Sequence, residues 1–243
     1  MLPFGKGDEG GPAVVGHRGA PLVAAENTPA AFAAAAAAGA GWVELDARRS
    51  RDGTVVVHHD ACTADGTPVV DQDAGRLRAR GVWTLAAVLD RLPPGLGVDV
   101  EVKNFPGEPD HDDEHRLTAL VADVLRAAAG GRPRLTSSFN PLTVAALAAG
   151  MPGVPAGLVH GPGLRLDAAA EIGREFGATV VCPHVDAPAL DARTVATVRA
   201  AGMAVMVWPV DDPVRAVELA AVGVDALCTN DPAELVQALR RRR

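Results

Sequence analysis

Short apolar runs alternate with longer Ala- and Leu-rich stretches along most of the 243-residue chain. The short runs are rich in Val and have the length of buried strands, whereas the Ala- and Leu-rich stretches have the length of helices. This pattern predicts strands at 13–17, 42–47, 97–103, 134–138, 155–160, 178–183, 203–208 and 224–229, and helices at 29–38, 84–92, 114–129, 141–149, 167–176, 191–201, 212–221 and 232–241.

The regular succession of strand and helix is typical of βαβ units around a parallel sheet. Eight such pairs favour an α/β fold, the (β/α)8 TIM barrel, in which one closed sheet leaves no edge unpaired. A doubly wound open sheet is the alternative. We expect a single barrel domain over residues 13–241, preceded by a flexible N-terminal segment over residues 1–12.

A short insertion interrupts the alternation between the second predicted strand and the second predicted helix. It covers residues 51–82, and residues 54–59 predict an additional strand after the Asp52-Gly53 turn. Long loops that follow barrel strands lie at the C-terminal mouth, where catalytic residues of TIM barrels are found. We therefore expect the insertion to contribute to a functional site.

Composition and charge narrow the classes of partner. Thirty acidic residues against 23 basic ones give a net charge of -7, which opposes binding to nucleic acids or anionic membranes. The three cysteines, Cys62, Cys182 and Cys228, are scattered along the chain and predict reduced thiols in a cytoplasmic protein. No run approaches the roughly 18 to 20 uncharged apolar residues that span a bilayer, so we expect no stable membrane insertion.

Polar side chains gather at the ends of the first three predicted strands. His17 and Arg18 follow the first strand, Glu44 and Asp46 end the second, and Glu101 and Lys103 end the third; His59 lies in the insertion. Residues two apart in a strand point to the same face. The side chains of Glu44 and Asp46 on the second strand, and those of Glu101 and Lys103 on the third, should therefore point into the barrel mouth.

Three carboxylates in one place repel one another unless a cation compensates them. The oxygen ligands of Glu44, Asp46 and Glu101 suit a divalent cation, Ca²⁺ or Mg²⁺. The alternative is a set of internal ion pairs with Arg18 and Lys103.

Next to a bound cation, Arg18 and Lys103 would bind an anion, with phosphate the obvious candidate. His17 and His59 could then act as general acid and general base. His160 and His184, also at strand ends, could reach the mouth as substrate contacts.

Several motifs resemble the glycerophosphodiester phosphodiesterase family, which has a TIM-barrel fold. They are "GHRGA" with "ENTPAAF", "GAGWVELDARRSRDGTVVVHHD", "VDVEVKN", "SSFNP", "VMVWPVDD" and "GVDALCTNDPAEL", and together they cover about residues 13–237. The resemblance implies acid/base catalysis by His17 and His59, metal binding by Glu44, Asp46 and Glu101, and phosphate contacts from Arg18 and Lys103. It also places Glu26 near the site and Trp208 in the wall of the pocket. His58, next to His59, should point to the opposite face.

The implied reaction is metal-dependent hydrolysis of a small glycerophosphodiester to glycerol 3-phosphate and an alcohol. A lysophospholipase D-like phosphodiesterase and a non-catalytic barrel that binds phosphate ligands are the alternatives. We expect no loop with exposed bulky apolar residues, which argues against a long-chain substrate. The acidic stretch 107–115 is expected to form a solvated loop rather than a metal site. The sequence does not indicate an oligomeric state.

Overall fold

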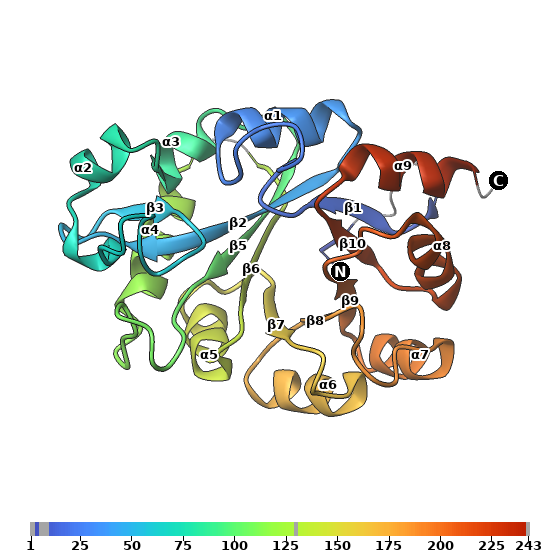
Figure 1. The fold of residues 1–243 in the computed structure, drawn as a ribbon. Helices are drawn as coiled ribbons and strands as arrows, with labels where there is room; N and C mark the ends of the chain where they lie inside the picture. Colours follow the sequence, from blue (N-terminus) through green and yellow to red (C-terminus); the bar gives the residue numbers. More distant parts are fainter. Residues whose placement is uncertain (1–2, 5–9, 129–130, 242–243) are drawn as a thin grey trace.

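The computed structural model describes residues 3–4, 10–128 and 131–241, and within these residues ten strands form one sheet. Eight of them are parallel and close into a barrel, because β1 (Ala13–Gly16) pairs with β10 (Ala226–Thr229) on one side and with β2 (Trp42–Arg49) on the other. The circle is completed by β5 (Gly97–Val102), β6 (Arg134–Ser138), β7 (Ala156–His160), β8 (Val180–Pro183) and β9 (Ala204–Val207) (Figure 1). The predicted TIM barrel is confirmed, and the doubly wound alternative is wrong.

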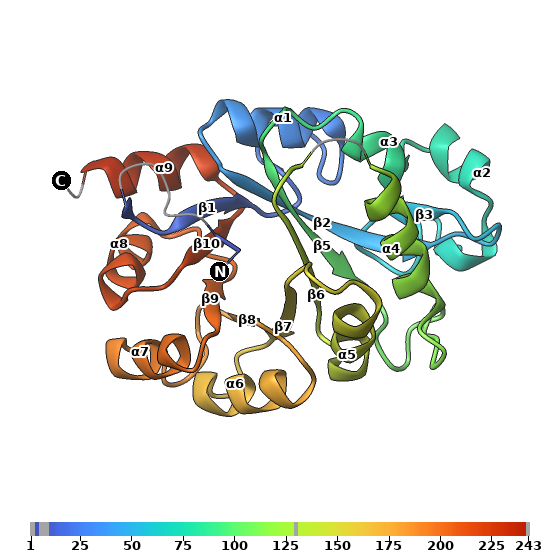
Figure 2. The same cartoon turned by 180° about the vertical axis from the view of Figure 1, so that it is seen from behind.

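Helices surround the barrel, as the views from the two sides show (Figures 1 and 2). The first one has clear start and stop signals, since the Thr28 side chain accepts a hydrogen bond from Ala31 N, Pro29 is the first helical residue and Gly39 has φ 96°. Residue 129, at the end of one predicted helix, lies outside the described residues. The helices are α1 (Pro29–Ala37), α3 (Leu85–Leu89), α4 (Arg116–Ala127), α5 (Pro141–Gly150), α6 (Leu166–Glu175), α7 (Ala192–Ala200), α8 (Pro213–Val222) and α9 (Pro232–Arg241).

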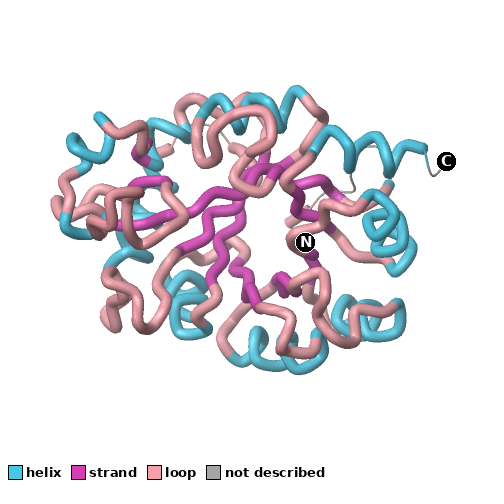
Figure 3. Tube along the Cα trace, viewed as in Figure 1, coloured by secondary structure: helices cyan, strands magenta, loops and turns pink. Residues whose placement is uncertain are grey.

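The insertion extends the sheet at the C-terminal end of β2. Its strand β3 (Val55–Val57) pairs antiparallel with β2, and β4 (Trp83–Thr84) pairs with β3. Figure 3 shows the loops around these strands on the same side of the barrel as β2. The 3₁₀ helix η2 (Val69–Asp71) and helix α2 (Ala74–Ala79), which the pattern did not predict, cover β3 and give the insertion a small apolar core formed by Val56, Val69, Leu77 and Val82.

The barrel interior is apolar at the N-terminal ends of its strands. Trp42, at the start of β2, meets Phe4 with ring centroids 5.1 Å apart, and its indole lies where a Cβ on Gly97 would be, only 2.3 Å away. Phe4 belongs to the segment expected to be flexible, of which residues 1–2 and 5–9 lie outside the described residues. With this end filled, the polar side chains of the interior are left at the opposite, C-terminal mouth.

Candidate active site

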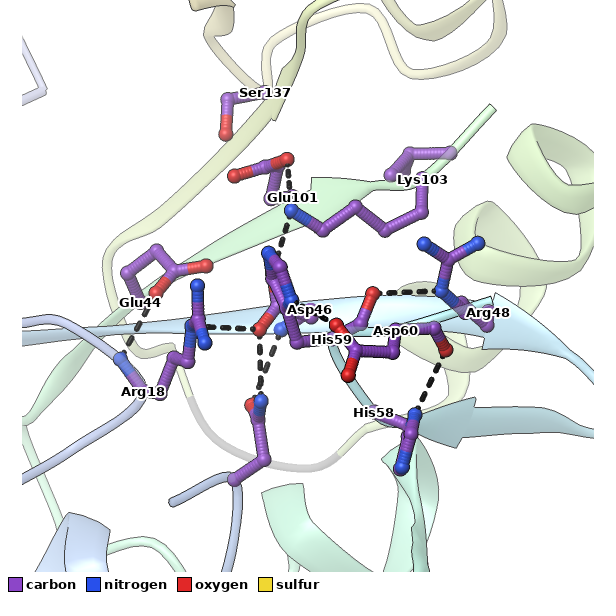
Figure 4. Close-up of polar contacts among 12 residues, drawn as sticks. Arg18, Glu44, Asp46, Arg48, His58, His59, Asp60, Glu101, Lys103 and Ser137 are labelled. Carbon is purple, nitrogen blue, oxygen red and sulfur yellow. Dashed lines mark hydrogen bonds and ion pairs between the residues drawn. The ribbon is translucent and has the colours of Figure 1, made fainter. Parts of the chain in front are cut away.

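Three buried carboxylates converge at the C-terminal ends of β2 and β5. The strand register places Asp46 beside Glu101, and Glu44 lies two residues before Asp46 on the same face of β2. One carboxylate oxygen from each of Glu44, Asp46 and Glu101 lies within 4.8 Å of the other two. The structure therefore brings together the three acids that the sequence singled out (Figure 4).

Two cations lie against this acidic cluster. Lys103 Nζ is 2.8 Å from Asp46 Oδ1 and also contacts Glu101, while Arg18 Nε is 3.3 Å from Asp46 Oδ2. Burial alone would raise the pKa of Asp46, but Lys103 and then Arg18 hold that pKa well below its usual range. The internal ion pairs considered from the sequence are thus present for two of the three acids.

Glu44 is different, because it has no Lys or Arg side chain within ion-pair distance among the described residues. Its Oε2 accepts a hydrogen bond from the Arg18 backbone N at 2.9 Å, whereas its Oε1 is buried without a hydrogen-bond partner. Burial, followed by the charges of Asp46 and Glu101, raises the pKa of Glu44 well above its ordinary value. Three carboxylates against two cations leave one negative charge, so the donor set fits a hard divalent cation.

His17 is oriented by a chain of hydrogen bonds from the loops that follow β9 and β10. Its Nδ1 is 2.8 Å from Asn230 Oδ1, and Asn230 Nδ2 donates to Asp211 Oδ2 at 2.7 Å. Since an amide oxygen only accepts, the His17 proton lies on Nδ1, and Nε2 faces Glu44 at 4.0 Å. Burial and then the charge of Arg18 lower the pKa of His17, so the ring is neutral at pH 7 with a free lone pair on Nε2.

His59 follows β3 and points toward Asp46, whereas His58 points away from it (Figure 4). His59 Nδ1 is 2.7 Å from the Asp60 carboxylate, and this hydrogen bond lowers the pKa of Asp60. His58 Nδ1 instead lies 2.8 Å from the backbone oxygen of Asp60. The predicted opposite orientation of the two histidines is therefore what the structure has.

Arg48 is a residue of the site that the sequence reasoning missed. Its side chain is fully buried, and its Nε donates to the backbone oxygen of His59 at 2.8 Å. Its NH1 group donates to Asp110 Oδ2 at 2.7 Å and to Glu108 Oε2 at 2.9 Å. One feature of the sequence could have identified it: Arg48 lies two residues after Asp46 on the same strand, and therefore on the same face.

The acidic stretch 107–115 is a loop, as expected, but it is solvated only in part. Asp110 and Asp112 are buried, and Asp110 together with Glu108 holds Arg48. The expectation of full solvation failed because the countercharge comes from another strand, which the local sequence does not reveal. Among the described residues, the group with the geometry of a metal site is Glu44, Asp46 and Glu101, none of which lies in this stretch.

Asn27 was also missed, although the neighbouring Glu26 was noted. Asn27 has φ 59°, a left-handed conformation that Asn tolerates, and its Nδ2 donates to Asp46 Oδ2 at 2.7 Å. Its Oδ1 accepts from Asp46 N at 3.2 Å. Glu26 lies on the other side of this turn and pairs with Arg18 at 3.2 Å. The turn before α1 therefore fixes both an acid of the cluster and the guanidinium beside it.

Trp208, the residue after β9, borders the site. Its ring centroid is 6.4 Å from that of His17, 5.4 Å from that of Phe139 and 5.3 Å from that of His184. The indole Nε1 donates to the Cys182 backbone oxygen at 2.9 Å, which fixes the plane of the ring. The structure thus places Trp208 and His184 side by side near His17. His160 is buried at the end of β7, and burial lowers its pKa.

A cavity of about 280 Å³ opens beside the acidic cluster. Its lining includes His59, Glu101 and Lys103 of the cluster together with Phe105, Glu108 and Phe139; Arg48, Asp60, Ala61, Val102, Asn104 and Ser138 complete it.

Bulky apolar side chains are exposed around the mouth, contrary to expectation. Leu22 and Val23, in the loop after β1, are 72% and 75% exposed, and Phe105, in the loop after β5, is 51% exposed. The sequence did not reveal them because Leu22-Val23 and Phe105 are too short as apolar runs to stand out among the polar and small residues around them. Within the described residues, no helix is both long enough and apolar enough to cross a membrane.

Comparisons with known proteins agree with the geometry. The model of the glycerophosphoryl diester phosphodiesterase family matches residues 17–234. A phosphodiesterase from Oleispira antarctica, solved in complex with the product sn-glycerol-3-phosphate, is 25% identical and superposes with a TM-score of 0.82 over 95% of this chain and 97% of that one. A glycerophosphodiester phosphodiesterase from Agrobacterium tumefaciens is 26% identical, with a TM-score of 0.72 over 93% of this chain and 99% of that one. A Bacillus subtilis relative, provisionally named for the same activity, is 26% identical over 90% of this chain and 94% of its own length.

Proposed function

Because this chain belongs to the glycerophosphoryl diester phosphodiesterase family, we propose that it hydrolyses small glycerophosphodiesters to glycerol 3-phosphate and an alcohol in a metal-dependent reaction. One observation carries the metal dependence: Glu44 is buried beside Asp46 and Glu101 with an oxygen that lacks a partner. The product bound to the Oleispira relative supports glycerol 3-phosphate as the part common to all substrates.

In this proposal Glu44, Asp46 and Glu101 hold Ca²⁺ or Mg²⁺. When bound, the cation supplies Lewis-acid polarisation of a phosphoryl oxygen. Arg18 and Lys103, already fixed in place by Asp46, bind the phosphate and stabilise the negative charge that grows on its oxygens in the transition state. Glu26 orients Arg18 through their ion pair. Trp208 and His184 bound the substrate on the side of His17.

The two histidines divide the proton transfers. His17 is the base, because its Nδ1–H is engaged by Asn230 and its Nε2 lone pair faces the cluster. It accepts the proton of the attacking oxygen, which belongs to water or to the substrate's own hydroxyl. His59 is the acid and protonates the alcohol oxygen as its bond to phosphorus breaks. Overall, one water supplies a hydroxyl to phosphorus and a proton to the alcohol.

The exposed apolar side chains favour a second candidate substrate, a lysophospholipid cleaved in the manner of a lysophospholipase D. Leu22, Val23 and Phe105 could contact an acyl chain that extends from the mouth. A comparison of lysophosphatidylcholine with glycerophosphocholine, below and above the micelle concentration of the lipid, separates the two candidates. A larger kcat/KM for the lysolipid that falls in the Leu22→Ser/Val23→Ser variant would favour the second.

The test of the primary proposal is release of glycerol 3-phosphate from glycerophosphocholine with and without EDTA. Chelation should abolish turnover, and added Ca²⁺ or Mg²⁺ should restore it. His17→Ala and His59→Ala should each lower kcat about 10² to 10⁴-fold. His58→Ala is the matched control, since this ring points away from the cluster, and should retain activity. Binding of the ester without turnover under any condition would instead indicate a non-catalytic barrel.

We propose that the protein works in the cytoplasm without stable insertion into a membrane. This proposal rests on the composition and on three cysteines that the structure leaves as free thiols, Cys62, Cys182 and Cys228.

A further inference from the structure

The cavity beside the acidic cluster lies on the His59 side of the site. His59 and Lys103 line it, and His17 does not. If His59 protonates the leaving oxygen, as proposed above, the alcohol must lie on the same side of the phosphorus as His59. The cavity is then the space that the alcohol enters. Its volume of about 280 Å³ is small beside the roughly 300 to 1,000 Å³ of most small-molecule sites, so it suits a compact group.

The outer wall of this cavity is fixed in place by Arg48. The guanidinium joins β2 to the backbone of His59 and, through Glu108 and Asp110, to the loop after β5. Arg48 and Asp110 have side chains only 2% and 1% exposed, so this contact is shielded from solvent and holds the loop firmly. Phe105 and Glu108, on that loop, therefore have defined positions at the mouth of the cavity.

Charge around the cavity disfavours an anionic alcohol. Its two permanent cations are already paired, Lys103 with Asp46 and Glu101, and Arg48 with Glu108 and Asp110. The single positive charge of Arg48 is paired with two carboxylates, those of Glu108 and Asp110, which leaves one negative charge, while the Asp60 carboxylate is hydrogen-bonded to His59. Asp60 and Glu108 reach solvent, with side chains 75% and 33% exposed, and both line the cavity.

Two aromatic rings also line the cavity. Phe105 and Phe139 meet edge to face, with centroids 6.3 Å apart and ring planes at 77°. Two rings at a right angle beside carboxylates form a surface that attracts an ammonium group through both its charge and its methyl groups. We propose that this cavity is the subsite of the leaving alcohol, and that Phe105, Phe139 and Glu108 select a compact ammonium alcohol over a neutral or anionic one.

The test uses three esters of glycerol 3-phosphate that differ only in the alcohol. They are the 2-(trimethylammonio)ethyl ester, its uncharged isostere, the 3,3-dimethylbutyl ester, and the anionic 3-carboxypropyl ester. In the metal-loaded wild-type protein we expect kcat/KM for the ammonium ester to exceed that for the isostere about ten-fold. The anionic ester should be the poorest substrate. Release of glycerol 3-phosphate is measured for all three esters, so the assay reports whether the protein hydrolyses them at all as well as which alcohol it prefers.

Variants locate the preference in the cavity. Glu108→Gln and Phe105→Ala should each reduce the ratio of ammonium to neutral ester to about three-fold or less, mainly through KM of the ammonium ester. Asp113→Asn is the control, since it removes one charge from the same loop at a side chain that is 95% exposed and does not line the cavity. It should leave the ratio at the wild-type value.

The outcomes that would overturn the inference are distinct from a failure of the proposed function. If all three esters are hydrolysed with equal kcat/KM, the protein is the proposed enzyme and the subsite is wrong. A preference that persists in both the Glu108 and the Phe105 variants would place the alcohol elsewhere and would also refute the subsite. Hydrolysis of none of the esters would overturn the proposed function and this inference with it.

Discussion

Replacement of Arg48 by Met should strongly destabilise the fold, although the residue carries no chemistry in the proposed reaction. In the native structure Arg48 NH1 is 2.7 Å from Asp110 Oδ2, and the two side chains are 2% and 1% exposed. Removal of one partner leaves a carboxylate buried without a countercharge, which costs about 3 to 5 kcal/mol. In a protein of this size each kcal/mol shifts Tm by roughly 2 to 4 °C, so Tm should fall by about 6 to 20 °C.

Urea unfolding followed by circular dichroism measures this change, with Arg116→Met as the matched control. Arg116 pairs with Asp112 at 3.0 Å, but the Arg116 side chain is 62% exposed and the Asp112 carboxylate also accepts the backbone N–H groups of Glu114 and Arg116, so loss of the pair should cost no more than about 1 kcal/mol. The double variant Arg48→Met/Asp110→Asn removes both buried charges and should recover at least half of the lost stability. A loss in Arg48→Met no larger than in Arg116→Met would refute the view that this pair is shielded from water.

Three further predictions test other parts of the molecule. Glu44→Gln removes one of three carboxylates and should raise the Ca²⁺ or Mg²⁺ concentration for half-maximal activity at least about ten-fold; an unchanged requirement would exclude Glu44 as a ligand. Burial raises the pKa of Asp99 from 3.8 to about 7. Between pH 4 and pH 7 the folded state therefore keeps a proton on Asp99 that the unfolded state has lost. The contribution of Asp99 to the free energy of unfolding consequently falls as pH rises through this range. In EDTA, Asp99→Asn should therefore gain stability over wild type on the order of 3 kcal/mol at pH 8 and much less at pH 4, and an equal gain at both would contradict this assignment. Gly97→Ala places a Cβ 2.3 Å from the Trp42 indole and should lower the free energy of unfolding, measured in urea, by at least about 2 kcal/mol. An unfolding free energy equal to that of wild type would show that the indole moves freely.

Local sequence patterns were sufficient to predict the barrel. Each of the eight barrel strands falls within or close to a predicted strand, and most of these runs are apolar because the strands are buried on both faces; β6, with the sequence RLTSS, is the polar exception. The convergence of Glu44, Asp46 and Glu101 followed as well. Parallel strands in a barrel end at the same mouth, and the two-residue period of a strand decides which side chains point inward.

Pairings between distant segments were not predictable in this way. Arg48 and Asp110 are 62 positions apart, and His17 and Asn230 are 213 apart, so their contacts depend on strand register and on the path of each loop. The sequence by itself determined the barrel and the acids at its mouth, since both arise from local periodicity. Only the tertiary structure decided that no Lys or Arg side chain of the described residues pairs with Glu44, that an acidic loop is anchored by a buried arginine, and that His17 has its free nitrogen toward the cluster. A charge or a proton is placed by whichever groups surround it in space, and those groups come from every part of the chain.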